Sequence, residues 1–131
     1  MVMNRQGRNP LEELNPLLSR ENLVAMQDAV AATYMGEAVV KYLVDLIGAT
    51  RKNEDILRGA SPRATLSVMS MAKAVARLRG RDYVIPGDVR EVFTHTVAHR
   101  LLLSTKAQGQ NKTPEQVLQG ILSVVPMPKL R

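Results

Sequence analysis

Gly59-Ala60-Ser61-Pro62-Arg63-Ala64 opens the segment that decides the fold. Serine is a favoured N-cap and proline is favoured at the first helical position, so Ser61 and Pro62 fix where a helix begins. The residues that follow, up to Arg79, are rich in Ala, Met and Leu around most of the helix circumference, and Gly80 follows as a C-cap. We therefore predict a helix over residues 61–79 at the centre of a helical bundle.

Further helices are predicted on both sides of this segment. Apolar residues recur at helical spacing after Ser19, which is a good N-cap, and again after the break at residues 34–36. Proline, a favoured first helical residue, opens two later segments, and Thr113-Pro114-Glu115-Gln116 forms a capping box. The fold class is all-α, a small bundle of about five helices, with helices over residues 19–32, 37–51, 61–79, from 86 and from 113.

The segments between the helices complete the expected organisation. Two short apolar runs, Tyr83-Val84-Ile85 and Leu101-Leu102-Leu103, are candidates for a two-stranded β pair. Two prolines make residues 1–18 an extended connector, and residues 105–112 are polar and predicted to be a loop. The expected organisation is a connector over 1–18, a helical domain over 19–104, a loop over 105–112, and a C-terminal helix and tail over 113–131 that pack on the domain.

Composition narrows the classes of protein. The chain has 131 residues, the size of one domain, and it has no cysteine, which excludes disulfides and thiolate zinc sites. It has no apolar stretch of about 18 residues, so we expect no membrane segment. We expect the protein to be cytoplasmic. The net charge is +6, and the six basic residues between Ile56 and Asp82 have no acidic residue among them. An anionic partner fits this distribution.

Arg63 is the candidate binding residue. The first turn of a helix favours acidic side chains, because its unpaired N–H groups and dipole carry positive potential. An arginine at this position breaks that rule, and it would bind an anion such as phosphate together with the backbone donors. The alternative is a solvated arginine on a well-capped helix.

The stretch from Asn53 to Leu103 resembles the C-terminal lid of MoxR-type AAA+ ATPases. The resemblance rests on Asn-Glu-Asp-Ile-Leu-Arg-Gly-Ala-Ser-Pro-Arg-Ala, on Ala-Lys-Ala-Val-Ala-Arg-Leu-Arg-Gly-Arg-Asp-Tyr-Val-Ile-Pro-Gly-Asp-Val and on Ala-His-Arg-Leu-Leu-Leu. Asn9-Pro10-Leu11 is similar to the connector that leaves the ATPase core, and Val124-Val125-Pro126 to the family's chain end. One departure is Ile85-Pro86-Gly87-Asp88, where the family usually has a hydroxyl cap before the proline and an acidic residue after it.

The resemblance implies that Arg63 is the second sensor, which reaches the terminal phosphate of ATP, and that Ser61 and Pro62 fix where its helix starts. It also implies a core domain in cis that binds ATP and Mg²⁺, a homo-oligomeric ring, hexameric in this family, and a chaperone role on client proteins or von Willebrand factor A domain proteins. The sequence has no Gly-x-x-x-x-Gly-Lys-Ser/Thr loop, so we expect this chain alone neither to bind a nucleotide cofactor nor to hydrolyse ATP.

Three competing patterns remain. Lys73, Arg77 and Arg81 recur at four-residue spacing, which predicts a basic stripe for nucleic acid or a partner helix, although few aromatic residues are available for stacking. His95 and His99 have the spacing of a metal-binding pair, without a third ligand. The acidic pairs Glu12-Glu13 and Glu54-Asp55 are expected to be solvated. A free-standing basic helical module is thus the alternative to an ATPase lid.

Overall fold

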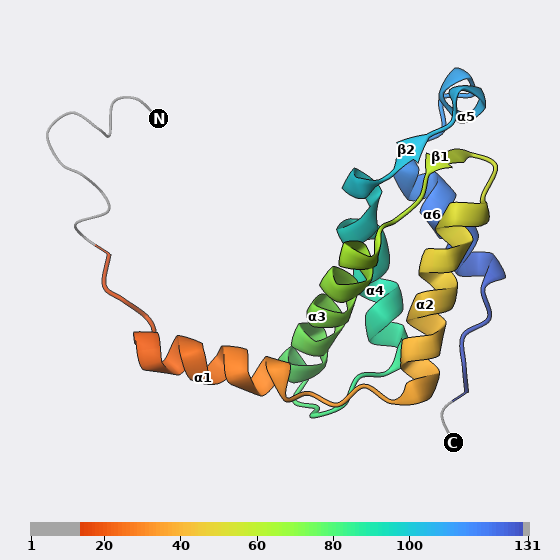
Figure 1. Ribbon diagram of the computed structural model, residues 1–131. Helices are drawn as coiled ribbons and strands as arrows, with labels where there is room; N and C mark the ends of the chain where they lie inside the picture. The colour runs from red at the N-terminus through yellow and green to blue at the C-terminus, as the bar shows by residue number, and fades with distance from the viewer. Residues whose placement is uncertain (1–13, 130–131) are drawn as a thin grey trace, which may run out of the picture.

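The computed structural model describes residues 14–129, which fold into a helical body with one projecting helix. Helices α2, α3, α4 and α6 form the body, and α1 extends away from one end of it (Figure 1). A short two-stranded sheet and α5 lie at the opposite end (Figure 1). The elements are α1 (Arg20–Ala31), α2 (Glu37–Lys52), β1 (Ile56–Arg58), α3 (Pro62–Leu78), α4 (Pro86–Val97), the 3₁₀ helix η3 (Ala98–Arg100), β2 (Leu102–Leu103), α5 (Thr105–Gly109) and α6 (Pro114–Val124).

The structure confirms the all-α fold and the predicted starts of the helices. Ser19 and Ser61 cap α1 and α3 with their side chains, and Thr113 and Gln116 form the capping box of α6. Gly80 has a φ of +72°, in the left-handed region that glycine adopts without strain, and it follows the end of α3. Residues 1–13, which include most of the predicted connector, Asn9-Pro10-Leu11 and Glu12-Glu13, lie outside the described residues.

The core lies where α2, α3, α4 and α6 meet. Helix α3 buries a stripe of small side chains, and their size allows α4 to pack closely against it. Phe93 of α4 and Leu43 and Leu46 of α2 are fully buried in the same core. The buried stripe of α3 consists of Ala64, Val68, Ala72 and Ala76.

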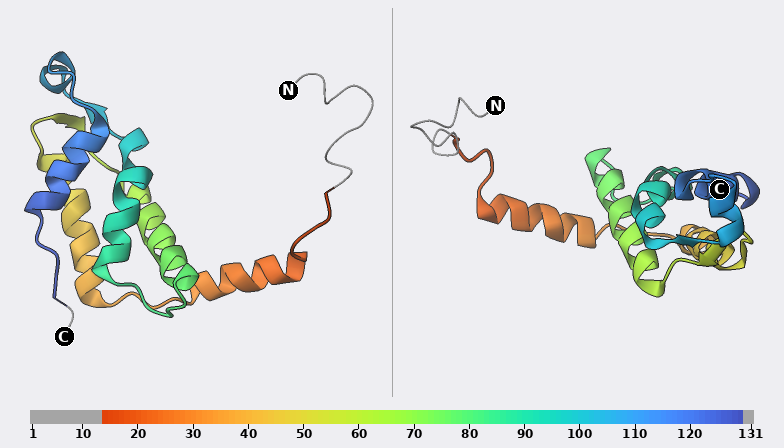
Figure 2. Two further views of the ribbon diagram at one scale, coloured as in Figure 1. Left: turned by 180° about the vertical axis from the view of Figure 1, so that it is seen from behind. Right: turned by 90° about the horizontal axis from the view of Figure 1, so that it is seen from above.

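One expectation about the helices is corrected. Helix α3 is not surrounded on all sides, because only this one stripe is buried and Leu66, Met71 and Leu78 are exposed. Helix α1 forms as predicted, but none of its residues is buried, so its apolar face is not part of the core. Figure 2 shows the same arrangement from two other sides, with α1 projecting from the body in both views. Both helices therefore present apolar surface to the outside.

The predicted β pair has a different partner. Leu102 and Leu103 pair antiparallel with residues 56–58, with Ile56 opposite Leu103. Tyr83 instead forms a single parallel bridge with Tyr34. Ile56 lies just after α2 and has a buried side chain, so this pairing closes the core at the end where α3 begins.

The predicted loop over residues 105–112 contains a short helix. Ser104 accepts a hydrogen bond from the Ala107 N–H at 3.3 Å, which caps α5, and Ala107 is fully buried. Asn111, with a φ of 54°, then turns the chain toward α6. Sequence polarity concealed this helix because it buries only one small side chain.

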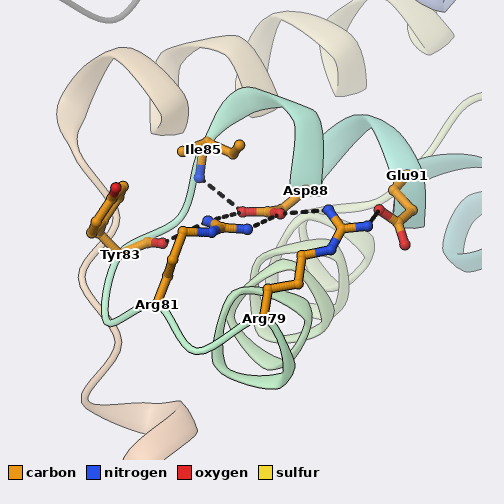
Figure 3. Close-up of polar contacts among 6 residues, drawn as sticks. All are labelled: Arg79, Arg81, Tyr83, Ile85, Asp88 and Glu91. Atoms are coloured by element: carbon orange, nitrogen blue, oxygen red, sulfur yellow. Dashed lines mark hydrogen bonds and ion pairs between the residues drawn. The ribbon is translucent and has the colours of Figure 1, made fainter.

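Asp88 organises the start of α4, and Figure 3 shows its contacts. Its carboxylate accepts from both terminal nitrogens of Arg81, at 2.8 and 2.6 Å, and from the Ile85 N–H at 2.9 Å. Arg79 approaches the same carboxylate at 3.3 Å and pairs with Glu91 at 2.6 Å. Ile85 has no side-chain cap to offer, so the carboxylate three residues later supplies the capping contact. The departure noted in the sequence thus leaves the helix start at Pro86 intact.

Candidate functional site

The first turn of α3 presents Arg63 to the outside of the molecule. Ser61 Oγ accepts a hydrogen bond from the Ala64 N–H at 3.4 Å, and Pro62 occupies the first turn, as the sequence predicted. Arg63 is exposed while Ala64, the next residue, is fully buried. The backbone is therefore anchored beside an exposed guanidinium.

Arg63 stands out when the first turns of the helices are compared. Helices α1, α2, α4 and α6 each place an acidic residue there: Glu21, Glu37, Asp88 and Glu115. Helix α3 has none, and neither does the five-residue α5. The chain thus follows the dipole rule in its other long helices and departs from it where Arg63 lies. This contrast strengthens the case for an anion at the start of α3.

A shallow groove runs past Arg63 along α3. No carboxylate of the described residues lines it, and its lining includes Arg100 of η3 and His95 of α4. Within residues 14–129, no hydrogen bond or ion pair involves the Arg63 guanidinium. Two arginines, Arg63 and Arg100, therefore line the same groove. Its lining is Arg63, Leu66, Ser67, Ser70, Met71, His95, Thr96 and Arg100.

The last turn of α2 holds the segment that leads into α3. Thr50 Oγ1 accepts from the Ala60 N–H at 2.9 Å, and Arg51 Nε donates to the Ala60 carbonyl oxygen at 2.9 Å. A Cβ on Gly59 would lie 2.8 Å from Arg51 Cα, so only glycine permits this approach. The sequence analysis gave neither Thr50 nor Arg51 a role. The signal that could have pointed to Thr50 was its hydroxyl group among the apolar residues that α2 buries.

The three residues of the predicted basic stripe, Lys73, Arg77 and Arg81, form hydrogen bonds within the chain. Lys73 Nζ donates to the Ala31 carbonyl oxygen at 3.0 Å, and Arg77 Nε donates to the Ala29 carbonyl oxygen at 3.0 Å. Arg81 lies beyond the end of α3 and binds Asp88. The three side chains therefore do not form one free basic surface.

An apolar groove lies between α1 and α3. We call it the α1–α3 groove; its apolar residues are Leu23, Met26, Ala29, Val30 and Ala31 of α1 and Leu66, Met69, Ala74 and Leu78 of α3. Several of these side chains are half exposed or more, including Leu66 at 65% and Leu78 at 85%. Exposed apolar surface of this kind is typical of an interface.

The remaining candidate patterns do not form sites. His95 lines the groove of Arg63, whereas His99 accepts a hydrogen bond from Arg100 Nε at 3.1 Å. No group of three potential metal-ligating side chains occurs within residues 14–129. Asp55 is not simply solvated, because it pairs with Lys112 at 2.7 Å. Over the same residues, no helix has both the length and the apolarity needed to cross a membrane.

Comparison with known proteins identifies the family. Residues 48–121, more than half of the chain, match the family described as AAA lid domain. The chain belongs to this family. The chain, which we call the lid from here on, is 36% identical over 138 residues to the chaperone MoxR1 of Mycobacterium tuberculosis. The alignment covers 98% of the lid. It is 31% identical to YeaC of Bacillus subtilis, an uncharacterized protein, over 97% of the lid.

A solved structure supports the same assignment. The lid superposes on a candidate ATPase from Cytophaga hutchinsonii with a TM-score of 0.83 and 26% identity, over 97% of the lid. These matches confirm a MoxR-type AAA+ lid. The chain spans 36% of MoxR1, 40% of YeaC and 41% of the solved protein, which is about two fifths of the length of each.

Proposed function

We propose that this lid works with an AAA+ core domain in the same polypeptide, and that Arg63 is its second sensor. The core would hold ATP and Mg²⁺, and Arg63 would reach across the nucleotide cleft to the terminal phosphate. Loss of that phosphate on hydrolysis would remove the partner of Arg63 and change the position of the lid. Under this proposal the lid has no ATPase activity by itself.

The single observation that carries this proposal is the state of the Arg63 side chain. The side chain is exposed in the first turn of α3, and no described residue accepts a hydrogen bond from its guanidinium. A forked, permanently charged side chain at a helix start is well suited to a phosphate. Ser61 and Pro62 contribute by fixing the residue at which the helix begins.

The surroundings of Arg63 suit a partner domain. The α1–α3 groove shares Leu66 and Ser70 with the groove of Arg63, so the two surfaces are continuous along α3. We propose that the core domain in cis covers the α1–α3 groove when Arg63 reaches its nucleotide. A core that binds both surfaces would couple phosphate loss to lid movement.

The wider role follows from the family and from the name of one relative. MoxR1 of M. tuberculosis is named a chaperone. We propose that the complete ATPase forms a homo-oligomeric ring, a hexamer by family resemblance, and remodels client proteins in the cytoplasm. Clients with von Willebrand factor A domains are part of this proposal.

The test is Arg63→Ala and Arg63→Lys in the ATPase that contains this lid. We expect Arg63→Ala to lower kcat for ATP by about a hundredfold, the scale of removing one preorganised donor from a developing charge. Arg63→Lys should recover only part of this loss, because lysine lacks the forked geometry. Steady-state hydrolysis and nucleotide affinity are the measurements.

Arg20→Ala is the matched control. Arg20 also lies in the first turn of a serine-capped helix, but Glu21 follows it there. We expect its removal to leave turnover unchanged. Full turnover and affinity in Arg63→Ala would refute the sensor assignment, and an equal loss in Arg20→Ala would show that the effect is not specific to Arg63.

A further inference from the structure

Two residues at the end of α2 hold the backbone that leads to Arg63. We propose that Thr50 and Arg51 are positioning residues for the sensor, an inference that rests on the proposed function of Arg63. They act through Ala60, which does not line the groove of Arg63.

Both polar backbone groups of Ala60 are held by α2. The buried Thr50 hydroxyl accepts from the Ala60 N–H at 2.9 Å and donates to the Ile47 carbonyl oxygen at 2.7 Å, so its orientation is fixed within α2. Arg51 Nε donates to the Ala60 carbonyl oxygen at 2.9 Å. Ala60 is 1% exposed, so water cannot readily replace these contacts.

Close contact with α2 restricts the segment further. An added Cβ on Gly59 would meet Arg51 Cα and Cγ at 2.8 Å and Arg51 N at 2.9 Å. The Gly59 backbone therefore lies directly against the last turn of α2. We call the contacts of Thr50 and Arg51 with Gly59 and Ala60 the α2 clasp.

Little freedom remains between the clasp and the sensor. Only Ser61 and Pro62 separate Ala60 from Arg63, and the proline ring fixes one backbone angle of that pair. Ala64, immediately after Arg63, is fully buried against the core. The backbone of Arg63 is thus fixed on both sides, and the clasp is the contact that ties it to α2. A shift of about 1 Å in a positioned group can cost a large factor in rate.

The experiment is a double-mutant cycle in the ATPase that contains this lid. Thr50→Val keeps the shape of the side chain but removes the hydroxyl, and Thr50→Ser is its matched control. We expect Thr50→Val to lower kcat about tenfold, because Arg63 would be displaced from its position. Thr50→Ser should retain most of the turnover. In an Arg63→Ala background, Thr50→Val should cause no further loss, since there is no longer a sensor to position.

Hydrogen exchange in this chain provides a readout independent of catalysis. Thr50→Val should accelerate exchange at the Ala60 amide and leave the Val68 amide of α3 unchanged. If Thr50→Val does not fold, Arg51→Met takes its place in the cycle, since Arg51 is exposed and methionine keeps an apolar stem. Arg51→Met removes only the donor to the Ala60 carbonyl oxygen, so its kcat should fall less than tenfold.

The possible failures are distinguishable. Normal turnover in Arg63→Ala would refute the proposed function, and the positioning role with it. Impaired Arg63→Ala with full turnover in Thr50→Val, despite faster exchange at Ala60, would overturn the clasp alone. An equal loss from Thr50→Val with and without Arg63 would show that Thr50 supports the fold rather than the sensor.

Discussion

Arg77 Nε donates to the carbonyl oxygen of Ala29 at 3.0 Å, and this contact joins α3 to the last turn of α1. Lys73 makes a second such contact with the Ala31 carbonyl oxygen at 3.0 Å. Carbonyl groups in the last turn of a helix have no partner within the helix and carry negative potential. Two cations from α3 therefore cap α1. Since α1 buries none of its residues, we expect these contacts to help to fix its direction.

Removal of this cap should loosen α1 without unfolding the body. In Arg77→Leu, we expect the rate of amide exchange in the last two turns of α1 to rise about threefold. This corresponds to the loss of about 0.5–1 kcal/mol of stabilisation by a cation at the helix end. The melting temperature should change little, because the core does not include α1. Exchange mass spectrometry and thermal unfolding by circular dichroism are the measurements, with exposed Arg58→Leu as the control. Unchanged exchange in α1 would show that apolar contact alone holds the helix.

The same contacts lead to a prediction about nucleic acid. Phosphate binding by Lys73 and Arg77 would require them to release α1, and Arg81 would have to leave Asp88. We therefore expect a labelled DNA duplex to bind this chain only weakly at 50 mM salt, with an affinity that Lys73→Gln and Arg77→Gln together leave unchanged. A strong salt dependence that these two changes remove would support the basic-module alternative instead.

Asp88 should make stability depend on pH. Burial is the largest single influence and raises its pKa, but hydrogen bonds from Arg81 and the Ile85 N–H, with the charges of Arg81 and Arg79, together lower the pKa below its ordinary value of 3.8. A carboxyl whose pKa is lower in the folded state stabilises the fold above its unfolded pKa. That stability is lost as the pH falls through the folded pKa.

Asp88→Asn is the corresponding variant. At pH 7 we expect it to lower the free energy of unfolding by about 1–3 kcal/mol, because Arg81 and the Ile85 N–H lose a charged acceptor. The difference in the free energy of unfolding between Asp88→Asn and the unsubstituted chain should become smaller as the pH falls below about 4. Urea unfolding across this range measures both effects. Glu91→Gln is the control, because its half-exposed pair with Arg79 should contribute little. A constant difference at all pH values would contradict the linkage.

The local signals in the sequence predicted the helices well. Ser61-Pro62, Gly80 and Thr113-Pro114-Glu115-Gln116 act through neighbouring backbone groups, so they can be read without knowledge of the fold. The partner of Leu102–Leu103 could not be read in this way, because strand pairing depends on which segments the core brings together. The same holds for the site. Arg63 was visible as a local exception, whereas the contact between Thr50 and Ala60 exists only after α2 and α3 have packed.

Gly59 and Gly48 provide a paired test of the α2 clasp. A Cβ on Gly59 would overlap the Arg51 backbone, whereas a Cβ on Gly48, within α2, would meet nothing within 4 Å. Gly59→Ala should therefore displace the segment before α3 and lower the free energy of unfolding by about 1–3 kcal/mol, as for overpacking. Gly48→Ala should raise it by about 0.5–1 kcal/mol, because alanine favours a helix more than glycine does.

Chemical denaturation of the two variants measures these opposite signs. Exchange at the Ala60 amide separates the local from the global effect, since Gly59→Ala should accelerate it more than its loss of global stability explains. Gly48→Ala should slow exchange throughout α2 and leave the position of the clasp unchanged. If Gly59→Ala were as stable as the unsubstituted chain and kept its Ala60 amide protected, the close approach of residue 59 to Arg51 would not be needed to hold the start of α3.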